Sequence, residues 1–358
     1  MAVFFAFFVW RAKTNDGFAA DQSRLIRVGF CRIGRCVLRA IYERNLQNDI
    51  EVVAINELAD CETISYMLRY DSTHGRFPHD VNVTQDQLSI QSGIDQKTIK
   101  ILHKPTIQEL PWSELNVDVV LECTGQFKSH EGLSLHLKQG AKKVLLSQPG
   151  EPDVDFTLIA GVNDNDLSQS DQIISVGSCS TNCVLPVMQL IHGQYEIERG
   201  VSTTIHSAMN DQPVIDAYAS DLRRTRAAVT SIIPVDTALA KGISRIMPHL
   251  EGHMECVHLR VPTLNVSLMD LTLHLKKETT VSEINKLLKN QSNQQLKGLI
   301  GFTHEPHASV DFNHDARSGV VDGSQTKVSD GRLLKLIIWF DNEWGFSNRM
   351  VDALENHV

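Results

Sequence analysis

The sequence predicts an α/β fold with a doubly wound parallel sheet in its first part and an α+β domain with a mostly antiparallel sheet in its second. Up to about residue 175, short apolar runs alternate with helical stretches, which is typical of parallel strands joined by crossover helices. Beyond that point, strand-like segments alternate between apolar and polar residues, as in antiparallel sheets with one solvated face. With 358 residues, the chain is long enough for two domains.

The first part contains four apolar runs that we predict to be parallel strands. The run at 50–55 is apolar almost throughout, which favours a strand buried on both faces. Ile33, Val37 and Ile41 recur at a spacing of four and predict a helix directly after the first strand. The four predicted strands are residues 25–28, 50–55, 117–123 and 144–146.

The second part contains five segments that we predict to be strands. Leu271, Leu273 and Leu275 alternate with polar residues, so one face of their strand should be buried. Residues 207–231 are polar and have no clean period, which predicts a long loop of the kind that is usually functional or lies at an interface. The five predicted strands are residues 202–206, 255–261, 268–275, 309–312 and 333–339.

Composition excludes several classes of partner. The formal net charge of -9 argues against a broad nucleic-acid surface, which needs basic patches. The seven cysteines show neither a disulfide framework nor paired zinc spacing, so free thiols and a cytoplasmic location are expected. His249 and His253 lack the glutamate of H-E-x-x-H, and no metal site is expected.

The N-terminal residues 1–22 begin with a strongly apolar run, Met1 to Trp10, followed by Arg11 and Lys13. The run is too short to cross a bilayer as a helix, which takes roughly 20 residues, and a secretory signal would place its basic residues first. We therefore interpret the segment as an extension that plays no part in the fold, with a signal peptide or anchor as the alternative. No membrane partner is expected.

The turn between residues 29 and 34 is the first candidate site. Gly29 and Gly34 flank a turn that opens a helix after a strand, the context in which a helix N-terminus faces a dinucleotide pyrophosphate. Cys31 stands where G-x-G-x-x-G has its middle glycine. Glu57 follows the next strand, where an acidic residue would hold the adenine ribose and favour NAD over NADP. The alternative is a structural strand–helix–strand unit without a ligand.

The second candidate site is the hexapeptide from Ser178 to Cys183. Apolar positions follow it, so it should begin a helix, and a helix N-terminus lowers the pKa of a thiol such as Cys179. The hydroxyls of Ser178 and Ser180 could bind a polar ligand. His206, at the end of a predicted strand, could pair with the thiol as a base. For each residue taken alone, an inert cysteine or a structural histidine is the alternative.

Several motifs in order resemble the glyceraldehyde-3-phosphate dehydrogenase superfamily. They are Ser178-Cys-Ser-Thr-Asn-Cys183, Thr204-Ile-His206, Arg260-Val-Pro-Thr263 and Trp339-Phe-Asp-Asn-Glu-Trp-Gly-Phe-Ser-Asn-Arg349. The resemblance runs from about Leu25 to Ala353. It implies a Rossmann-type NAD domain at 23–177, completed by a C-terminal helix at 343–358, and a catalytic domain at 178–342. It also implies a homotetramer in which the 207–231 loop lies between subunits.

The resemblance assigns roles to individual residues. Cys179 would be the nucleophile and His206 the base, and Asn342 would hold the nicotinamide carboxamide. The substrate would be a small phosphorylated aldose. The residues implied for NAD are Gly29, Phe30, Arg32, Ile33, Gly34, Glu57, Thr124, Gly125 and Asn342, and those for the substrate phosphate are Ser178, Ser180, Asp211, Arg224, Thr237 and Arg260.

Within the family, the chain is most similar to the branch that oxidises D-erythrose 4-phosphate to 4-phospho-D-erythronate for pyridoxal 5'-phosphate synthesis. The likeness lies in 53–60, 206–212 and 233–237. Met209 and Ala238 stand where glycolytic members have a threonine that contacts phosphate and a glycine. In this branch water should release the thioester. The alternatives are a phosphorylating enzyme of the glycolytic type and a non-catalytic NAD-binding relative.

Overall fold

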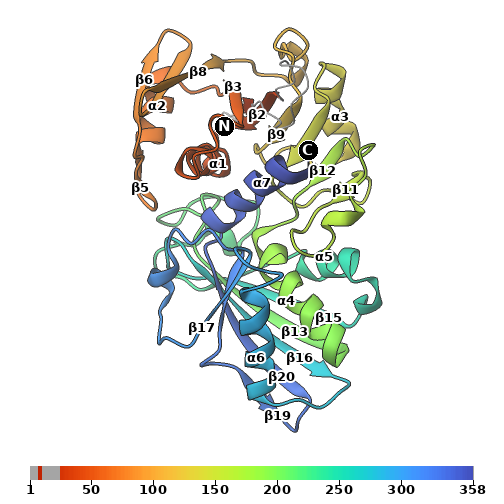
Figure 1. Cartoon of the computed structure of the whole chain (residues 1–358). Coiled ribbons are helices and arrows are strands. Elements are labelled where there is room, and N and C mark those ends of the chain that lie inside the picture. The colour runs from red at the N-terminus through yellow and green to blue at the C-terminus, as the bar shows by residue number, and fades with distance from the viewer. Residues whose placement is uncertain (1–6, 10–24, 358) are drawn as a thin grey trace. The chain divides into compact units, whose positions relative to one another are not determined.

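The chain folds into two compact units in a computed structural model that describes residues 7–9 and 25–357 (Figure 1). The first unit comprises Met1–Leu158, Asp164–Gly177 and Ser347–Val358. The second comprises Ile159–Asn163 and Ser178–Phe346. Each unit has its own sheet and its own buried core.

Six parallel strands form the centre of the first unit, which confirms the predicted parallel sheet and adds β8 and β12 to its four predicted strands. Their order is β12-β10-β9-β2-β3-β8, in which the chain starts in the middle and builds outward to each side in turn. In such sheets, ligands bind beyond the carboxyl ends of the strands where the order reverses, here between β2 and β9. The six strands are β2 (Leu25–Gly29), β3 (Glu51–Asn56), β8 (Asp95–Leu102), β9 (Val119–Glu122), β10 (Lys143–Leu146) and β12 (Ile173–Ser175).

Shorter strands extend this sheet at both edges. A parallel strand, β11 (Phe156–Thr157), pairs with β12. At the other edge, β7 (Gln87–Ser92) and β6 (Asp80–Thr84) run antiparallel. A separate two-stranded ribbon consists of β4 (Tyr70–Asp71) and β5 (Gly75–Arg76).

The expectation that the N-terminal extension plays no part in the fold is wrong for residues 7–9. They form β1 (Phe7–Val9), which pairs antiparallel with β2 and with β3. This pairing provides hydrogen-bond partners for backbone N–H and C=O groups along part of β2 and part of β3. The rest of residues 1–22 lies outside the described residues.

Three helices of the first unit follow its strands. They are α1 (Arg32–Glu43), α2 (Cys61–Arg69) and α3 (His130–Lys138), and short 3-10 turns lie at η1 (Ile107–Glu109) and η2 (Asp164–Asp166). The last helix, α7 (Trp344–His357), contributes its residues from Ser347 onward to this unit. There, Arg44 forms ion pairs with Asp352 at 2.7 Å and Glu355 at 2.8 Å.

The second unit contains the predicted, mostly antiparallel sheet. Its strand order is β14-β15-β13-β16-β20-β18-β17, with parallel pairing only between β13 and β15 and between β17 and β18 among the described residues. The strands are β13 (Ile197–His206), β14 (Ile233–Val235), β15 (Met254–Arg260), β16 (Ser267–Leu275), β17 (Ile300–Thr303), β18 (Gly319–Asp322), β19 (Lys327–Ser329), which pairs with β20, and β20 (Leu333–Phe340).

The core of the second unit lies on one face of this sheet. Leu271, Leu273 and Leu275 of β16 are fully buried, as their alternation predicts. They share a cluster with apolar residues of α4 (Cys179–Tyr195), α5 (Leu239–Ile246) and α6 (Val281–Ser292). Since α4 is apolar on nearly all sides after its first residues, burial fixes where its N-terminus lies.

The predicted strand at 309–312 is instead a 3-10 turn, η5 (Ser309–Phe312). The carboxylate of Asp311 accepts the backbone N–H of Ala308 at 2.7 Å and closes this turn locally. A side chain that binds its own backbone in this way competes with sheet pairing, which explains the difference.

The 207–231 stretch is a loop with a single 3-10 turn, η3 (Arg223–Thr225), and a further turn, η4 (Pro248–Leu250), lies beyond it. The loop exposes large apolar side chains, including Ile215 at 77%, Tyr218 at 99% and Leu222 at 83% of their surface. Clustered apolar exposure is typical of a surface that a partner covers. The homotetramer itself stays a prediction.

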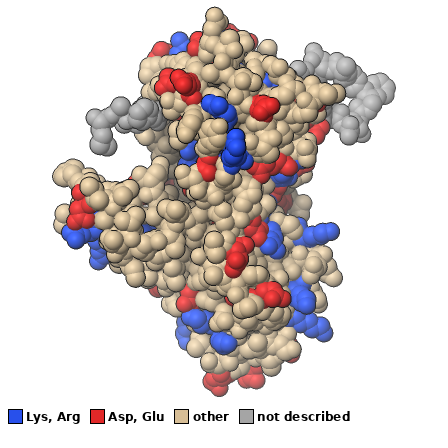
Figure 2. All heavy atoms as spheres, turned by 90° about the vertical axis from the view of Figure 1, so that its left-hand side faces the viewer, with Lys and Arg blue, Asp and Glu red and all other residues tan. Residues whose placement is uncertain are grey.

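The surface drawn in Figure 2 carries basic and acidic side chains in small, interspersed groups. Within residues 7–9 and 25–357, no helix is both long and apolar enough to cross a bilayer.

Two buried histidines lie on the neighbouring strands β13 and β15. His206 and His258 stack with ring centroids 4.9 Å apart and an interplanar angle of 26°. Burial lowers the pKa of His206 to about 4 and that of His258 to about 3, and the charge of Arg260 acts in the same direction on both. Both rings are therefore neutral in the folded protein at neutral pH.

The free energy of unfolding should fall as the pH is lowered from about 6.5 towards 4. Because both folded pKa values lie below the unfolded value, the unfolded chain binds the protons first, at up to about 1.4 kcal/mol per pH unit for each histidine. Urea unfolding at several pH values measures this. A His258→Gln variant should show a shallower slope over the same range, and an unchanged slope would contradict the assignment.

Candidate functional site

The turn between β2 and α1 supplies an anion site at a helix N-terminus. Cys31 is the N-cap residue of α1, yet no side chain caps the helix there. The first N–H groups of an uncapped helix need partners, and the phosphate oxygens of a dinucleotide provide them. Of the other predicted turn residues, Phe30 and Gly34 are buried, whereas Arg32 and Ile33 are partly exposed. The turn therefore fits a pyrophosphate.

The Cys31 thiol has a defined partner. It donates to the carbonyl oxygen of Cys123, at the end of β9, over 2.6 Å. Burial raises the pKa of Cys31, although the backbone N–H groups of Gly34 and Ile33 act in the opposite direction. The side chain at this non-glycine position thus joins the carboxyl ends of β2 and β9, between which the strand order reverses.

Arg32 forms an ion pair with Asp71 of β4. Although burial alone would raise it, the pKa of Asp71 is well below its usual range, because Arg32 and the N–H groups of His74 and Thr73 bond its carboxylate. Asp71 therefore holds the guanidinium of Arg32 beside the predicted cofactor turn.

Glu57 directly follows β3 and is 7% exposed. Its Oε1 accepts the N–H of Leu58 at 2.8 Å and, less closely, that of Ala59 at 3.4 Å. Burial raises the pKa of Glu57, and these N–H groups partly oppose the shift. A carboxylate fixed through one oxygen retains acceptor sites for the ribose hydroxyls of NAD.

A buried polar chain that the sequence did not indicate holds the turn at Thr124 and Gly125. Glu122 of β9 accepts the Thr124 N–H at 2.7 Å and also its hydroxyl. The other oxygen of Glu122 lies 3.2 Å from Nε2 of His136, whose Nδ1 accepts the indole N–H of Trp112 at 3.3 Å. Gly125 has a φ of +73°, where a side chain would be strained. The sequence could not indicate this network, because Trp112, Glu122 and His136 are far apart along the chain and meet only in the folded protein.

In the second unit, Ser178 caps α4. Its hydroxyl accepts the Thr181 N–H at 3.1 Å, and the Thr181 hydroxyl accepts the Ser178 N–H at 2.7 Å. This reciprocal capping fixes the first turn, so Cys179 is held as the first residue of the helix. Ser178, which is expected at the substrate phosphate, therefore also stabilises the N-terminus of α4.

The Cys179 thiol and the His206 imidazole meet at this helix start. Cys179 Sγ lies 3.7 Å from His206 Nε2 and 4.0 Å from the hydroxyl of Ser180. His206 Nδ1 lies 2.8 Å from the Ser207 carbonyl oxygen, to which it must donate. That bond leaves Nε2 unprotonated in the neutral ring and directed at the thiol.

The expected lowering of the Cys179 pKa is wrong. Burial raises the pKa of Cys179, and the contributions of Ser180 and Arg260 only partly oppose it. Because the pKa of His206 is also lowered, the pair consists of a neutral thiol and a neutral imidazole at neutral pH. Desolvation outweighs the helix dipole here.

His258 is a further residue that sequence reasoning missed. It is 8% exposed and stacks on His206, and its Nε2 is buried without a hydrogen-bond partner. The signal was present in the alternation of β15, which places His258 on the same side of its strand as Arg260.

Arg260 is an unsatisfied buried cation. It is 8% exposed, and its Nε and Nη1 have no hydrogen-bond partner. Burial lowers its pKa, whereas the charge of Asp211 acts in the opposite direction. Buried guanidinium donors without partners indicate that an anion completes the site.

Other residues expected at the phosphate are arranged differently. Arg224 is paired with Asp211 through Nη1 at 2.8 Å, so it reaches a ligand only if that pair is shared. Thr237 lies just before α5, and its hydroxyl accepts the Leu239 N–H at 3.2 Å. Arg226, two residues after Arg224, forms an exposed pair with Asp216 at 2.9 Å.

Asn342 is held by two serines. Its Oδ1 accepts hydroxyl hydrogen bonds from Ser207 at 2.9 Å and Ser267 at 2.8 Å. With the oxygen used in this way, the amide NH₂ is the group that can donate to a carbonyl of a ligand, as a nicotinamide carboxamide requires. Ser207 connects Asn342 to His206, because its carbonyl oxygen bonds His206 Nδ1 and its hydroxyl bonds Asn342 Oδ1.

Two family models match the chain over most of its described length. The model described as glyceraldehyde 3-phosphate dehydrogenase, NAD binding domain, matches residues 24–130. The model described as glyceraldehyde 3-phosphate dehydrogenase, C-terminal domain, matches residues 178–342. Together with the doubly wound sheet, the uncapped helix start and the thiol–imidazole pair, they show that the chain belongs to the glyceraldehyde-3-phosphate dehydrogenase family, whose members are NAD-dependent dehydrogenases of phosphorylated aldehydes.

Proposed function

We propose that the protein oxidises D-erythrose 4-phosphate to 4-phospho-D-erythronate with NAD, through a thiohemiacetal and a thioester on Cys179 that water releases. The observation that carries the chemistry is the 3.7 Å contact between Cys179 Sγ and His206 Nε2, with Nδ1 of His206 tied to the Ser207 carbonyl. The sequence likeness and the side chain of Met209 support the four-carbon substrate.

The first step is attack by Cys179 on the aldehyde carbon. Since the resting thiol is neutral, His206 Nε2 takes its proton as the carbon–sulfur bond forms. The aldehyde oxygen becomes an oxyanion, which the backbone N–H of Cys179 at the start of α4 can stabilise. The imidazolium of His206 then returns the proton to this oxygen and completes the thiohemiacetal.

The second step oxidises the thiohemiacetal. Bound NAD supplies the hydride acceptor. His206 Nε2 takes the hydroxyl proton as the hydride leaves, and a thioester on Cys179 remains. After His206 has released this proton to solvent, its Nε2 removes a proton from water as the water attacks the thioester. It then returns the proton to the departing sulfur, which gives the acid and regenerates the thiol. Asn342 would hold the nicotinamide through its amide NH₂ throughout.

The substrate phosphate would couple to the base through Arg260. Burial and then the positive charge of Arg260 lower the pKa of His206. An anion bound to the unpartnered donors of Arg260 offsets that charge, so His206 becomes a stronger base when substrate is present. The arrangement would favour proton transfer in the occupied site.

Met209 supports a longer substrate than glyceraldehyde 3-phosphate. It stands where glycolytic members carry a phosphate-binding threonine, it is 41% exposed, and its N–H donates to Gln212 Oε1 at 3.1 Å. Without that hydroxyl, one phosphate position loses a hydrogen bond, which weakens the preference for the three-carbon substrate. The product would serve pyridoxal 5'-phosphate synthesis.

A phosphorylating enzyme of the glycolytic type is the second candidate, because inorganic phosphate could attack the same thioester. A non-catalytic NAD-binding relative is less well supported. A binding protein has no need for a thiol placed beside a histidine whose free nitrogen is directed at it.

Replacing Cys179 by alanine should abolish NADH formation, with a loss on the order of 10⁴-fold or more, because the covalent route disappears. NADH absorbance measures turnover, and quenching of protein fluorescence measures NAD binding, which should be retained. The matched control is Cys256→Ala, which removes a partly exposed thiol of β15 and should keep activity. Dehydrogenase activity in Cys179→Ala would refute the mechanism.

Replacing Arg260 by lysine should raise KM for the sugar phosphate by about 10- to 100-fold, because a point charge cannot reproduce bidentate binding. Steady-state kinetics at varied substrate concentration tests this. Arg226→Lys, which alters an exposed ion pair with Asp216, should leave KM within about twofold. Equal KM changes in both variants would argue against a phosphate site at Arg260.

Substrate preference should favour D-erythrose 4-phosphate over glyceraldehyde 3-phosphate without a requirement for inorganic phosphate. Rates of NADH formation from each aldehyde, with and without phosphate, test this directly. Met209→Thr should shift the ratio of kcat/KM towards the three-carbon substrate by about tenfold, the value of one hydrogen bond to a charged group. Phosphate-dependent preference for the three-carbon aldehyde in the unmodified protein would instead establish the glycolytic alternative.

A further inference from the structure

Three potential metal ligands converge on the surface of the first unit. Cys61 is the first residue of α2, Asp86 lies in the turn between β6 and β7, and His103 follows β8. The distances between their ligand atoms are 3.6 Å from Cys61 Sγ to His103 Nε2, 3.9 Å from Cys61 Sγ to Asp86 Oδ1, and 3.7 Å from His103 Nε2 to Asp86 Oδ1. These three residues, the Cys61 group, take no part in the chemistry proposed for Cys179.

The hydrogen bond on the far side of the imidazole directs Nε2 into the group. His103 Nδ1 lies 2.8 Å from the backbone oxygen of Glu57, to which it must donate, so the neutral ring has its lone pair on Nε2. Metal-binding histidines are typically oriented by such a bond from the second ring nitrogen. In a Cys–His–Asp hydrogen-bonded relay, the cysteine and the aspartate would lie on opposite ring nitrogens. Here both lie at Nε2.

The separations match the edges of a tetrahedral metal site. With bonds of about 2.3 Å to sulfur, 2.05 Å to nitrogen and 2.1 Å to oxygen, a tetrahedral zinc ion holds its ligand atoms about 3.4–3.6 Å apart. Each observed separation exceeds its ideal edge by about 0.3 Å or less. The Asp86 side chain is 70% exposed, so it can close this difference without moving packed atoms.

The backbone around the group is already fixed. Ile101 donates its N–H to the Asp86 carbonyl at 2.7 Å, and Glu57 donates its N–H to the Leu102 carbonyl at 2.9 Å. Both bonds lead to β8, which His103 follows directly. A metal ion would therefore bind a preformed arrangement, without the cost of ordering a loop.

We propose that Cys61, Asp86 and His103 bind a zinc-class divalent transition metal, with the fourth position open to water. One thiolate, one imidazole and one carboxylate suit zinc or cobalt and discriminate against magnesium and calcium, which prefer all-oxygen sites. The bound ion would join α2, the β6–β7 turn and the end of β8. Because cysteine binds a metal ion as its thiolate, binding should release the thiol proton and strengthen as pH rises.

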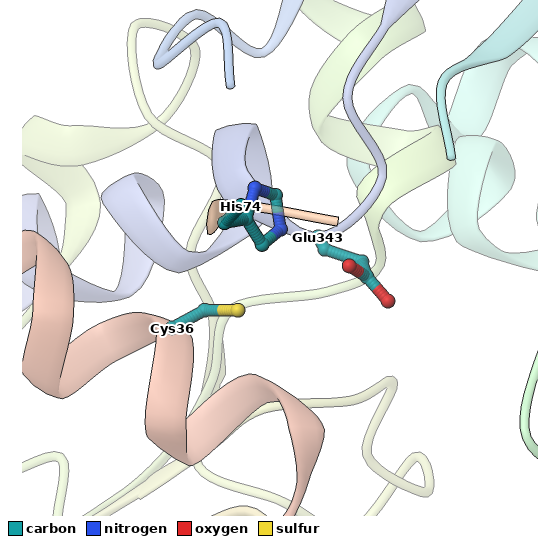
Figure 3. A group of neighbouring side chains, drawn as sticks. All are labelled: Cys36, His74 and Glu343. Carbon is teal, nitrogen blue, oxygen red and sulfur yellow. The ribbon is translucent and has the colours of Figure 1, made fainter. Parts of the chain in front are cut away.

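A second cluster of potential metal ligands is less suited to bind a metal than the Cys61 group. Figure 3 labels Cys36 of α1, His74 and Glu343, of which only Cys36 and His74 belong to the first unit. The sulfur of Cys36 and a ring nitrogen of His74 lie within 4.8 Å of each other. Cys36 is fully buried, and within the first unit this pair offers only two ligands. The Cys61 group provides three ligands from one unit and is open to solvent.

Cobalt titration of the full-length protein, freed of metal by a chelator, tests the proposal. One Co²⁺ per chain should produce the near-ultraviolet charge-transfer band of a cobalt–thiolate bond together with the visible bands of a tetrahedral ion, and Zn²⁺ should displace it while Mg²⁺ should not. Cys61→Ser should remove the charge-transfer band, and Asp86→Asn and His103→Gln should each weaken binding at least tenfold.

The controls separate this site from the other thiols. Cys256→Ser, which removes a partly exposed thiol of the second unit, should leave the cobalt spectrum unchanged. A charge-transfer band that persists in Cys61→Ser would place the metal on another cysteine and overturn the proposal, as would the absence of any band at millimolar Co²⁺. His103→Gln retains the thiol, so it tests the site even if Cys61→Ser fails to fold.

Discussion

The position of the α4 N-terminus beside the end of β13 is the constraint on which the chemistry of the second unit depends. Burial of the apolar sides of α4 against β16 fixes the helix, and the reciprocal capping of Ser178 and Thr181 fixes its first turn. Only then does the Cys179 sulfur lie 3.7 Å from the imidazole of His206. A shift of α4 by one residue would rotate the thiol away by about 100°.

Burial favours the neutral forms of Cys179, His206 and His258. It raises the pKa of the Cys179 thiol and lowers the pKa of the His206 and His258 rings, so the resting site keeps its reactive groups neutral. Arg260 is the exception, a buried cation whose Nε and Nη1 have no hydrogen-bond partner. An anion bound there would offset the free-energy cost of burying this cation, and under the proposed function it would also raise the pKa of His206.

In the first unit, the constraint lies in the turn before α1. Its backbone N–H groups must remain accessible to a dinucleotide although Cys31 replaces a glycine there. The Cys31 thiol is bonded to the Cys123 carbonyl, and the helix start has no side-chain cap. Along the same sheet, Glu122 and His136 hold the turn at Thr124, and β8 supports the Cys61 group. The turns beyond the carboxyl ends of the strands therefore carry the polar groups that a ligand would meet.

Local pattern in the sequence was sufficient for much of this description. Strand periodicity predicted both sheets, and the start of α4, the turn before α1 and the acidic residue after β3 follow from residues that are near neighbours in the chain. The same local reasoning was wrong at 309–312, where Asp311 bonds its own backbone, and for residues 7–9, which pair within the first sheet.

Tertiary structure alone decided the rest. It set the protonation states of Cys179 and His206, because desolvation depends on everything packed around a group. It also brought together His206 with His258, Glu122 with His136, and Cys61 with Asp86 and His103. A sequence determines which side chains can hydrogen-bond or bind a metal, but only the packing of distant segments determines which of them meet.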